Sequence, residues 1–220
     1  MLQKDGIICR LFSKKNLDPE LQKVDAGLFK ISEKNNKLYD VFRNRIIFPI
    51  KSHRDQIIGF GGRVIDPADN PKYLNSSDSD IFKKGRELYG LSEILKNKKR
   101  INRIVVVEGY TDVLSLFSND MNYAVATLGI ATSKVHIDKL FTHVDEVIFC
   151  FDGDDAGVKA AESALNISLS GLRDGKKIKF MFLPEGEDPS SLLEKEGKEE
   201  FEKRMENSKV LSEYPVSYTH

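Results

Sequence analysis

The sequence has little cysteine and no long hydrophobic run, and both shortages narrow the class of protein. Cys9 and Cys150 are its only cysteines and lie far apart in the chain, so we expect core or surface thiols rather than a disulfide, and no zinc site. No apolar stretch approaches the roughly 18 to 20 residues that span a bilayer. The first five residues contain no apolar signal core either, so the sequence predicts a cytoplasmic protein without a membrane partner.

The chain also has no net charge, but its charges are unevenly distributed. Residues 1–100 contain 21 Lys and Arg against 13 Asp and Glu, a net charge of +8, whereas residues 101–220 contain 13 against 21, a net charge of −8. This asymmetry is typical of a metal-using enzyme with a polyanionic substrate, although any single lysine could only solvate a helix. We expect a basic subdomain over residues 1–100, an acidic domain over 101–207 and a tail over 208–220.

Two apolar segments of the acidic half end abruptly in acidic residues. The run Val-Val-Val precedes Glu108, and the run Val-Ile-Phe-Cys-Phe precedes Asp152 and Asp154. Such runs are typical of buried parallel strands, whose carboxyl ends share the ligand-binding edge of an open α/β sheet. These acids should therefore converge, together with Asp112. Carboxylates this close repel one another unless a cation neutralises them, and Mg²⁺ fits best because it leaves positions for phosphate oxygens.

Helix capping is the simpler explanation for an acid or hydroxyl after a strand. Asp155 or Thr111 could serve only this purpose, since each stands where a helix is expected to begin. Capping accounts for one residue per helix start. It leaves Glu108 and the Asp152/Asp154 pair unexplained.

Beyond residue 100 the hydrophobic pattern alternates between strand and helix. Such alternation predicts an α/β domain, a parallel sheet flanked by helices with right-handed crossovers. The last expected strand leads into Pro-Glu-Gly-Glu-Asp-Pro, a third acidic cluster at the same edge. The expected strands are residues 104–107, 123–127, 146–151 and 179–183, and the expected helices are residues 111–118, 133–142, 156–172 and 190–206.

The pattern of the basic half predicts a smaller, mixed α+β subdomain. A helix should begin at Asp18, which is followed by proline at the first helical position. Residues 45–50 and 57–65 should form a hairpin around a polar turn. Gly61 and Gly62 within this hairpin favour a β-bulge.

The motifs of the two halves, taken together, resemble one known family. A strand-end glutamate followed by a strand-end Asp-x-Asp is the signature of a TOPRIM domain, which also occurs in topoisomerases, OLD-family nucleases and RecR-like recombination proteins. The basic half narrows the resemblance to the RNA polymerase core of DnaG-type bacterial primases. Its motifs follow the family's order: Phe-Arg-Asn-Arg-Ile-Ile-Phe-Pro-Ile (42–50), Gly-Phe-Gly-Gly-Arg (59–63), Pro-Lys-Tyr-Leu-Asn-Ser (71–76) and Phe-Lys-Lys-Gly-Arg-Glu-Leu-Tyr-Gly (82–90).

This resemblance implies a set of site residues. Three groups follow from the matched motifs: catalytic acids and metal ligands, contacts with the incoming nucleotide, and contacts with the DNA template. Glu108 could act as general base instead of ligand, and ordinary packing is an equal alternative for Tyr73. The implied sets are Glu108, Asp152 and Asp154 as catalytic acids, joined by Asp112 and Asp188 around Mg²⁺ or Mn²⁺; Arg63, Lys72, Tyr73, Asn75 and Lys84 for the nucleotide; and Arg43 and Arg45 for DNA.

The implied reaction is that of a DNA primase, which joins ribonucleoside triphosphates into a short RNA primer on a single-stranded DNA template. Phosphoryl transfer of this kind depends mainly on positioning and on stabilisation of charge. A TOPRIM nuclease stays open as an alternative and would cleave an oligonucleotide rather than extend it. A catalytically silent nucleic-acid-binding module also stays open, and it would bind template without incorporating nucleotides. A topoisomerase needs a nucleophilic tyrosine in a separate domain, for which no room remains.

Two features depart from the family pattern. The family usually has a second aspartate two residues after the position of Asp188, and here Ser190 stands there, a plausible helix cap in its own right. We therefore expect a weaker peripheral ion. The family's N-terminal zinc ribbon and C-terminal helicase-binding domain are absent from these 220 residues. The expectation is a fragment of a primase core, with a replicative helicase as partner only through the missing domain.

Overall fold

The chain divides into two compact units, which we describe one at a time. The computed structural model describes residues 27–97, 100–171 and 174–210, so the helix expected at Asp18, like Cys9, lies outside the described residues. The first unit ends at Lys83 and the second begins at Lys84. The described segment from Lys84 to Asn97, which its charge assigns to the basic half, thus packs with the acidic half.

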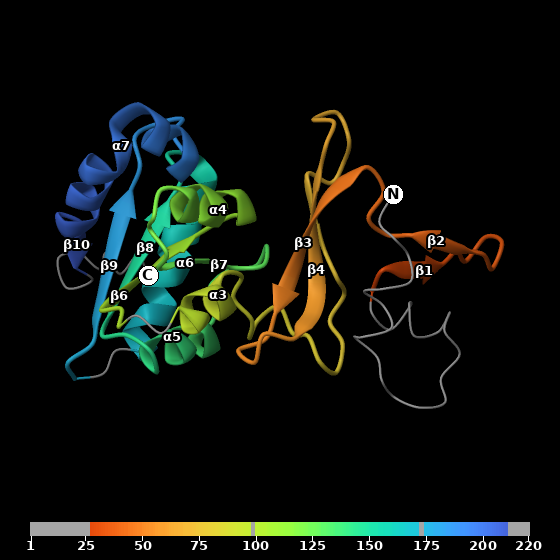
Figure 1. Cartoon of the computed structure of the whole chain (residues 1–220), viewed down its shortest axis with the longest axis horizontal. Coiled ribbons are helices and arrows are strands. Elements are labelled where there is room, and N and C mark those ends of the chain that lie inside the picture. Colours follow the sequence, from red (N-terminus) through yellow and green to blue (C-terminus); the bar gives the residue numbers. More distant parts are fainter. Residues whose placement is uncertain (1–26, 98–99, 172–173, 211–220) are drawn as a thin grey trace, which may run out of the picture. The chain divides into compact units, whose positions relative to one another are not determined.

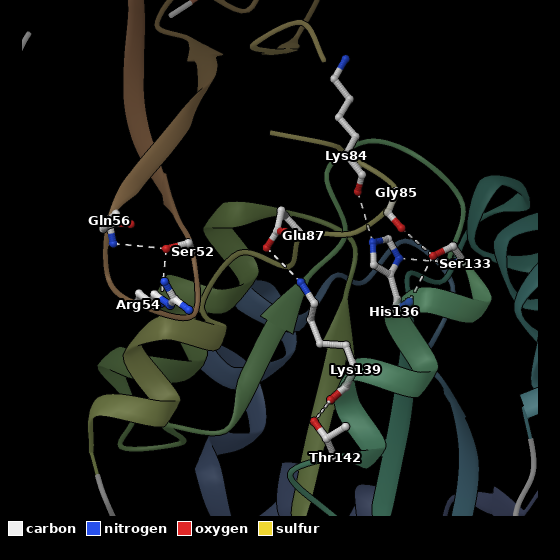
Figure 2. A network of polar contacts seen from close by, with 10 residues as sticks. All are labelled: Ser52, Arg54, Gln56, Lys84, Gly85, Glu87, Ser133, His136, Lys139 and Thr142. Carbon is white, nitrogen blue, oxygen red and sulfur yellow. Dashed lines mark hydrogen bonds and ion pairs between the residues drawn. The ribbon is translucent and has the colours of Figure 1, made fainter. Parts of the chain in front are cut away.

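In its described part the first unit consists of short antiparallel strands (Figure 1). One pair of strands accompanies a three-stranded sheet in which the predicted hairpin forms the first two strands. Ser52 closes the hairpin turn by accepting hydrogen bonds from the backbone amides of Arg54 and Gln56, at 3.3 and 3.4 Å (Figure 2). The strands are β1 (Phe29–Ile31) and β2 (Leu38–Asp40), then β3 (Arg45–Lys51), β4 (Ile57–Val64) and β5 (Tyr73–Asn75).

The β-bulge expected at Gly61 and Gly62 is wrong. Both glycines pair in regular register with β3, and the irregularity lies between Ile50 and Lys51. Gly62 serves close packing instead, because a Cβ there would lie 2.7 Å from the Cδ1 atom of the Phe42 ring. The missing side chain therefore makes room for an aromatic ring and leaves the ladder regular.

The second unit is a five-stranded sheet between two layers of helices (Figure 1). The four strands of the sequence pattern are parallel, which confirms the predicted α/β fold. A short antiparallel strand that the sequence did not predict adds to one edge. In spatial order the strands are β10 (Lys209–Val210), β9 (Lys177–Phe182), β8 (Glu146–Phe151), β6 (Arg103–Val107) and β7 (Ala124–Ala126).

Helices cover both faces of this sheet because its central strands are apolar on both sides. On one face α3 (Leu91–Lys96), α5 (Lys134–Phe141) and α6 (Asp155–Gly171) pack over the stacked rings of Phe149 and Phe180. On the other face lie α4 (Tyr110–Ser118) and α7 (Pro189–Glu206). Within the described ranges, no helix has the length and apolarity needed to cross a bilayer.

A turn at Tyr89 and Gly90 joins the start of the second unit to the sheet. Tyr89 exchanges two backbone hydrogen bonds of 3.0 Å with Ala126 of β7, and Gly90 follows with a φ of 88°. A Cβ on Gly90 would lie 2.7 Å from the carbonyl oxygen of Ala124. Both the backbone conformation and the available space therefore require glycine here.

We expect Gly90→Ala to destabilise the fold much more than Gly175→Ala does. Gly175 lies in a turn with a similar φ of 79°, but a Cβ added there would meet no atom within 4 Å, so alanine should cost only the positive-φ backbone penalty of about 1–2 kcal/mol. At Gly90 the collision with Ala124 should add about 1–3 kcal/mol. Urea unfolding of both variants measures the difference, and equal losses of stability would contradict the packing argument.

Candidate active site

The structure brings Glu108 and Asp152 together at the carboxyl edge of the parallel sheet. Glu108 directly follows β6 and Asp152 directly follows the neighbouring β8. The Glu108 Oε1 atom accepts a hydrogen bond of 3.3 Å from the backbone amide of Asp152. The pKa of Glu108 is nevertheless raised, first by burial and then by repulsion from Asp154.

Asp152 is the electrostatic centre of this edge. Burial raises its pKa to about 7, and repulsion adds to the shift from Glu108, Asp112, Asp188 and Asp154, in decreasing order. Its Oδ1 atom is buried and makes no hydrogen bond to any described residue. A buried carboxylate oxygen without a partner is costly, and either a proton or a cation would remove that cost.

Three of the candidate acids already bind backbone amides at helix starts. Asp112 Oδ2 accepts from Gly109 at 2.9 Å, Asp154 Oδ1 from Gly157 at 2.7 Å, and Asp188 Oδ1 from Ser191 at 2.7 Å. These bonds stabilise the first turns of α4, α6 and α7. Capping is therefore part of what these three acids do, which distinguishes them from Glu108 and Asp152.

The capping residues differ from those that the sequence suggested. Thr111 and Asp155 lie inside α4 and α6, whose first turns are held by Asp112 and Asp154. Ser190 is not a cap either, since Asp188 occupies that position in α7, with Pro189 after it. The third acidic cluster therefore leads into the first turn of α7, which begins at this edge of the sheet.

Gly153 holds the two acidic loops together. Its amide donates to the carbonyl of Glu187, and its own carbonyl accepts from the amide of Gly186, both at 3.0 Å. A Cβ on Gly153 would lie 1.8 Å from the carbonyl oxygen of Pro184, so no larger residue fits. The acids of two different loops are in this way held side by side, and the pattern of acids in the sequence gave no sign of this role.

The chemistry of the donor set fits a hard divalent cation. The unpartnered Asp152 Oδ1 and the raised pKa of the same carboxyl group show a local excess of negative charge. In the described ranges no group of three or more His, Cys, Asp or Glu side chains is already arranged around a metal position. A cavity of about 350 Å³ adjoins Glu108, with Thr132, Lys159 and Ser163 in its wall.

The first unit brings three of the nucleotide candidates together. The Arg63 guanidinium and the Lys72 ammonium each lie 5.7 Å from the ring centroid of Tyr73, within the range of a cation–π contact. Arg63 and Tyr73 face each other across β4 and β5, and Asn75 pairs with Gly61 in the same ladder. This cluster offers two cations beside one aromatic face.

The remaining basic candidates lie apart from that ring. Arg45 Nη1 donates to the Lys72 carbonyl at 3.4 Å, and the exposed Arg43 lies 5.8 Å from the ring of Tyr39. Lys84 belongs to the second unit, where its carbonyl lies 3.1 Å from Nε2 of the fully buried His136. His136 was missed because the Ser-x-x-His spacing has histidine where the usual capping box has Glu or Gln.

Comparison with known proteins gives the class of each part. Residues 2–95 match the family model "DNA primase catalytic core, N-terminal domain", and residues 105–193 match the model "Toprim-like". The DNA primases of Pseudomonas putida and Escherichia coli K12 are both 50% identical to the chain, over 192 and 191 residues. Each alignment covers 87% of this chain, but only 29% and 32% of the respective relative.

The solved structures agree with these matches. A DNA primase domain from Pseudomonas aeruginosa superposes with a TM-score of 0.87 at 46% identity, covering 96% of this chain and 65% of that one. A DnaG primase catalytic domain bound to single-stranded DNA superposes with a TM-score of 0.83 at 48% identity, covering 94% and 66%. The chain therefore belongs to the DnaG-type DNA primase family and corresponds to its catalytic core with a Toprim domain. It spans about a third of the length of the curated relatives, and Toprim domains imply divalent-metal binding in general.

We expect Asp152→Asn to stabilise the metal-free protein at pH 8. The folded pKa of Asp152 is raised from 3.8 to about 7, so the folded state binds more protons than the unfolded state between these values, and stability falls as pH rises through this window. Removing the charge removes that penalty, and the gain should fade towards pH 4. Urea unfolding in EDTA at pH 8 and pH 5 measures it.

Asp145→Asn is the matched control, because the Lys176 ammonium lowers the pKa of Asp145. Ionised Asp145 contributes stability that is present above its unfolded pKa and is lost as pH falls. Its replacement should therefore weaken the fold at pH 8, with the opposite sign. Equal effects of pH on the two variants would show that the acidic edge carries no special repulsion.

Proposed function

We propose that this chain is the catalytic part of a DNA primase, which joins ribonucleoside triphosphates into short RNA primers on a single-stranded DNA template during replication. The observation that carries the proposal is the pair of half-buried acids, Glu108 and Asp152, at the sheet edge of a chain whose two halves match primase catalytic cores. A related catalytic domain bound to single-stranded DNA supports the nature of the template.

Mg²⁺, with Mn²⁺ as a substitute, is the proposed cofactor. Glu108 and Asp152 would hold it, with the exposed side chains of Asp154 and Asp188 and the charge of Asp112 in support. When bound, the ion neutralises the acids and stabilises charge on phosphate oxygens. Because Ser190 adds no carboxylate beside Asp188, one well-held ion and one weaker ion are the expected set.

The basic residues of the first unit would bind the substrate. Arg63 and Lys72 can stabilise the negative charge of a triphosphate, and Tyr73 offers its ring to a base or sugar while both cations lie near it. Arg43 and Arg45 would contact the template backbone. A replicative helicase is a further proposed partner, which would bind outside this catalytic part.

Glu108→Gln and Asp152→Asn should each reduce primer synthesis by roughly 100-fold or more, as expected when a buried electrostatic contribution is removed from an active site. Both substitutions keep the shape of the side chain, so the fold should persist. The assay is extension on single-stranded DNA with labelled ATP, Mg²⁺ and then Mn²⁺. Asp145→Asn, at the amino end of β8, is the control, and full activity in either site variant would exclude the proposed acids.

The same gel distinguishes the alternatives that the sequence left open. A nuclease would shorten the labelled oligonucleotide, and a silent binding module would retain template without any incorporation. Longer products in the wild type, together with their loss in Asp152→Asn, would support a primase and exclude both alternatives.

Lys72→Ala should raise the KM for nucleotide about tenfold or more, as expected for a lost charge-assisted hydrogen bond, and should leave template affinity nearly unchanged. Arg43→Ala should do the reverse, and should lower the log–log salt slope of DNA binding by roughly one per phosphate contact. Nucleotide KM and DNA affinity across salt test this division. Indistinguishable profiles would contradict the assignment of Lys72 to the triphosphate and Arg43 to the template.

A further inference from the structure

The basic segment at the start of the second unit is held in place by side chains of α5 and its cap. Residues 84–87 lie outside any helix or strand, and they carry two cationic side chains, Lys84 and Arg86. Leu88 is buried immediately afterwards, and Tyr89 is bonded to β7. The residues that follow the segment are thus bonded to the sheet, and the segment itself contacts α5 and its cap.

The fully buried His136 makes one hydrogen bond with each ring nitrogen (Figure 2). Its Nδ1 atom accepts from the backbone amide of Ser133 at 3.2 Å, so the ring proton lies on Nε2. That Nε2 atom lies 3.1 Å from the Lys84 carbonyl and donates to it. The cap bond to Nδ1 therefore determines the tautomer of His136, and in this tautomer Nε2 donates its proton to the basic segment.

Two further contacts reach the same segment. The Ser133 Oγ atom donates to the Gly85 carbonyl at 2.7 Å, and the Lys139 ammonium lies 3.0 Å from the Glu87 carboxylate. Together with His136 they hold residues 84, 85 and 87, and we call the three side chains Ser133, His136 and Lys139 the α5 clamp. Figure 2 shows the side chain of Lys84 extending away from this clamp while its carbonyl points into it.

Helix capping alone does not require this arrangement. The cap of α5 uses only the Nδ1 atom of His136 and the Ser133 hydroxyl, which accepts from the His136 amide at 3.1 Å. A glutamate or glutamine at the same position caps a helix equally well. The second ring nitrogen and the Lys139–Glu87 pair contribute nothing to the cap, and each ends on residues 84–87.

We propose that His136 is a positioning residue for nucleotide use: through the α5 clamp it fixes the backbone at Lys84, so that the Lys84 side chain meets the triphosphate from a constant position. This rests on the proposed primase function. Fixing the backbone removes conformational freedom that binding would otherwise have to remove, so the loss of the clamp weakens nucleotide binding more than it slows the chemical step.

Asparagine and glutamine at position 136 separate the two bonds of the ring. Asparagine places an acceptor where Nδ1 lies, so it keeps the cap but cannot reach the Lys84 carbonyl. Glutamine places a donor where Nε2 lies, so it can keep that bond. We expect His136→Asn to raise the nucleotide KM about three- to tenfold, the effect of one lost hydrogen bond, with kcat within about twofold. His136→Gln should recover most of the wild-type KM.

The experiment measures primer synthesis by the 220-residue chain against ATP concentration, with template affinity and thermal stability as parallel readouts. His136→Asn should leave template affinity unchanged. In a Lys84→Ala background the same substitution should have no further effect on KM, because the two changes act through one contact. An unchanged KM in His136→Asn, an equal rise in His136→Gln, or an undiminished effect in the Lys84→Ala background would overturn the inference.

A different result would reject the proposed function itself. A wild-type chain that neither binds ATP with Mg²⁺ nor extends primers would reject the primase activity, and the positioning role with it. A wild type that makes primers beside a His136→Asn variant of equal KM would reject the positioning role alone.

Discussion

The second unit is organised around one constraint, the burial of a carboxylate that has too few partners. Asp152 must leave the end of β8 where Glu108 leaves β6, because the two parallel strands are neighbours. Burial is the largest cause that raises the pKa of Asp152 to about 7, and every charge that adds to this shift belongs to another carboxylate. Other features of this edge, including the Gly153 contacts and the capping bonds of Asp112 and Asp154, keep the acids together despite that repulsion.

Helix capping and the proposed function involve the same residues at this edge. A capping aspartate uses one oxygen for a backbone amide and keeps lone pairs for a second partner. Asp154 and Asp188 are held in this way by α6 and α7, so their positions are determined by helix starts and not by a ligand. The proposed cation site would therefore be largely formed before a cation binds, at the expense of stability in the metal-free protein.

Much of the second unit could be predicted because its strands and helices have strong, regular hydrophobic periods. The strand-end acids also follow from the sequence alone, since a parallel sheet aligns the carboxyl ends of its strands. The short β10 could not be predicted, because two residues carry no periodicity. The prediction at Gly62 was wrong because the partner of this glycine, the Phe42 ring, is brought close only by the folded sheet.

The packing of the segment that begins at Lys84 and the role of His136 do not follow from the sequence pattern, for a related reason. Charge assigns the segment after Lys84 to the basic half, but buried contacts, not charge, decide where a segment packs, and Leu88, Leu91 and Ile94 are buried in the core of the acidic half. Burial also lowers the pKa of His136, which keeps the ring neutral and its Nδ1 an acceptor. In this unit burial thus shifts the protonation of two groups: it raises the pKa of Asp152, and it lowers the pKa of His136 so that the neutral ring can serve the helix cap.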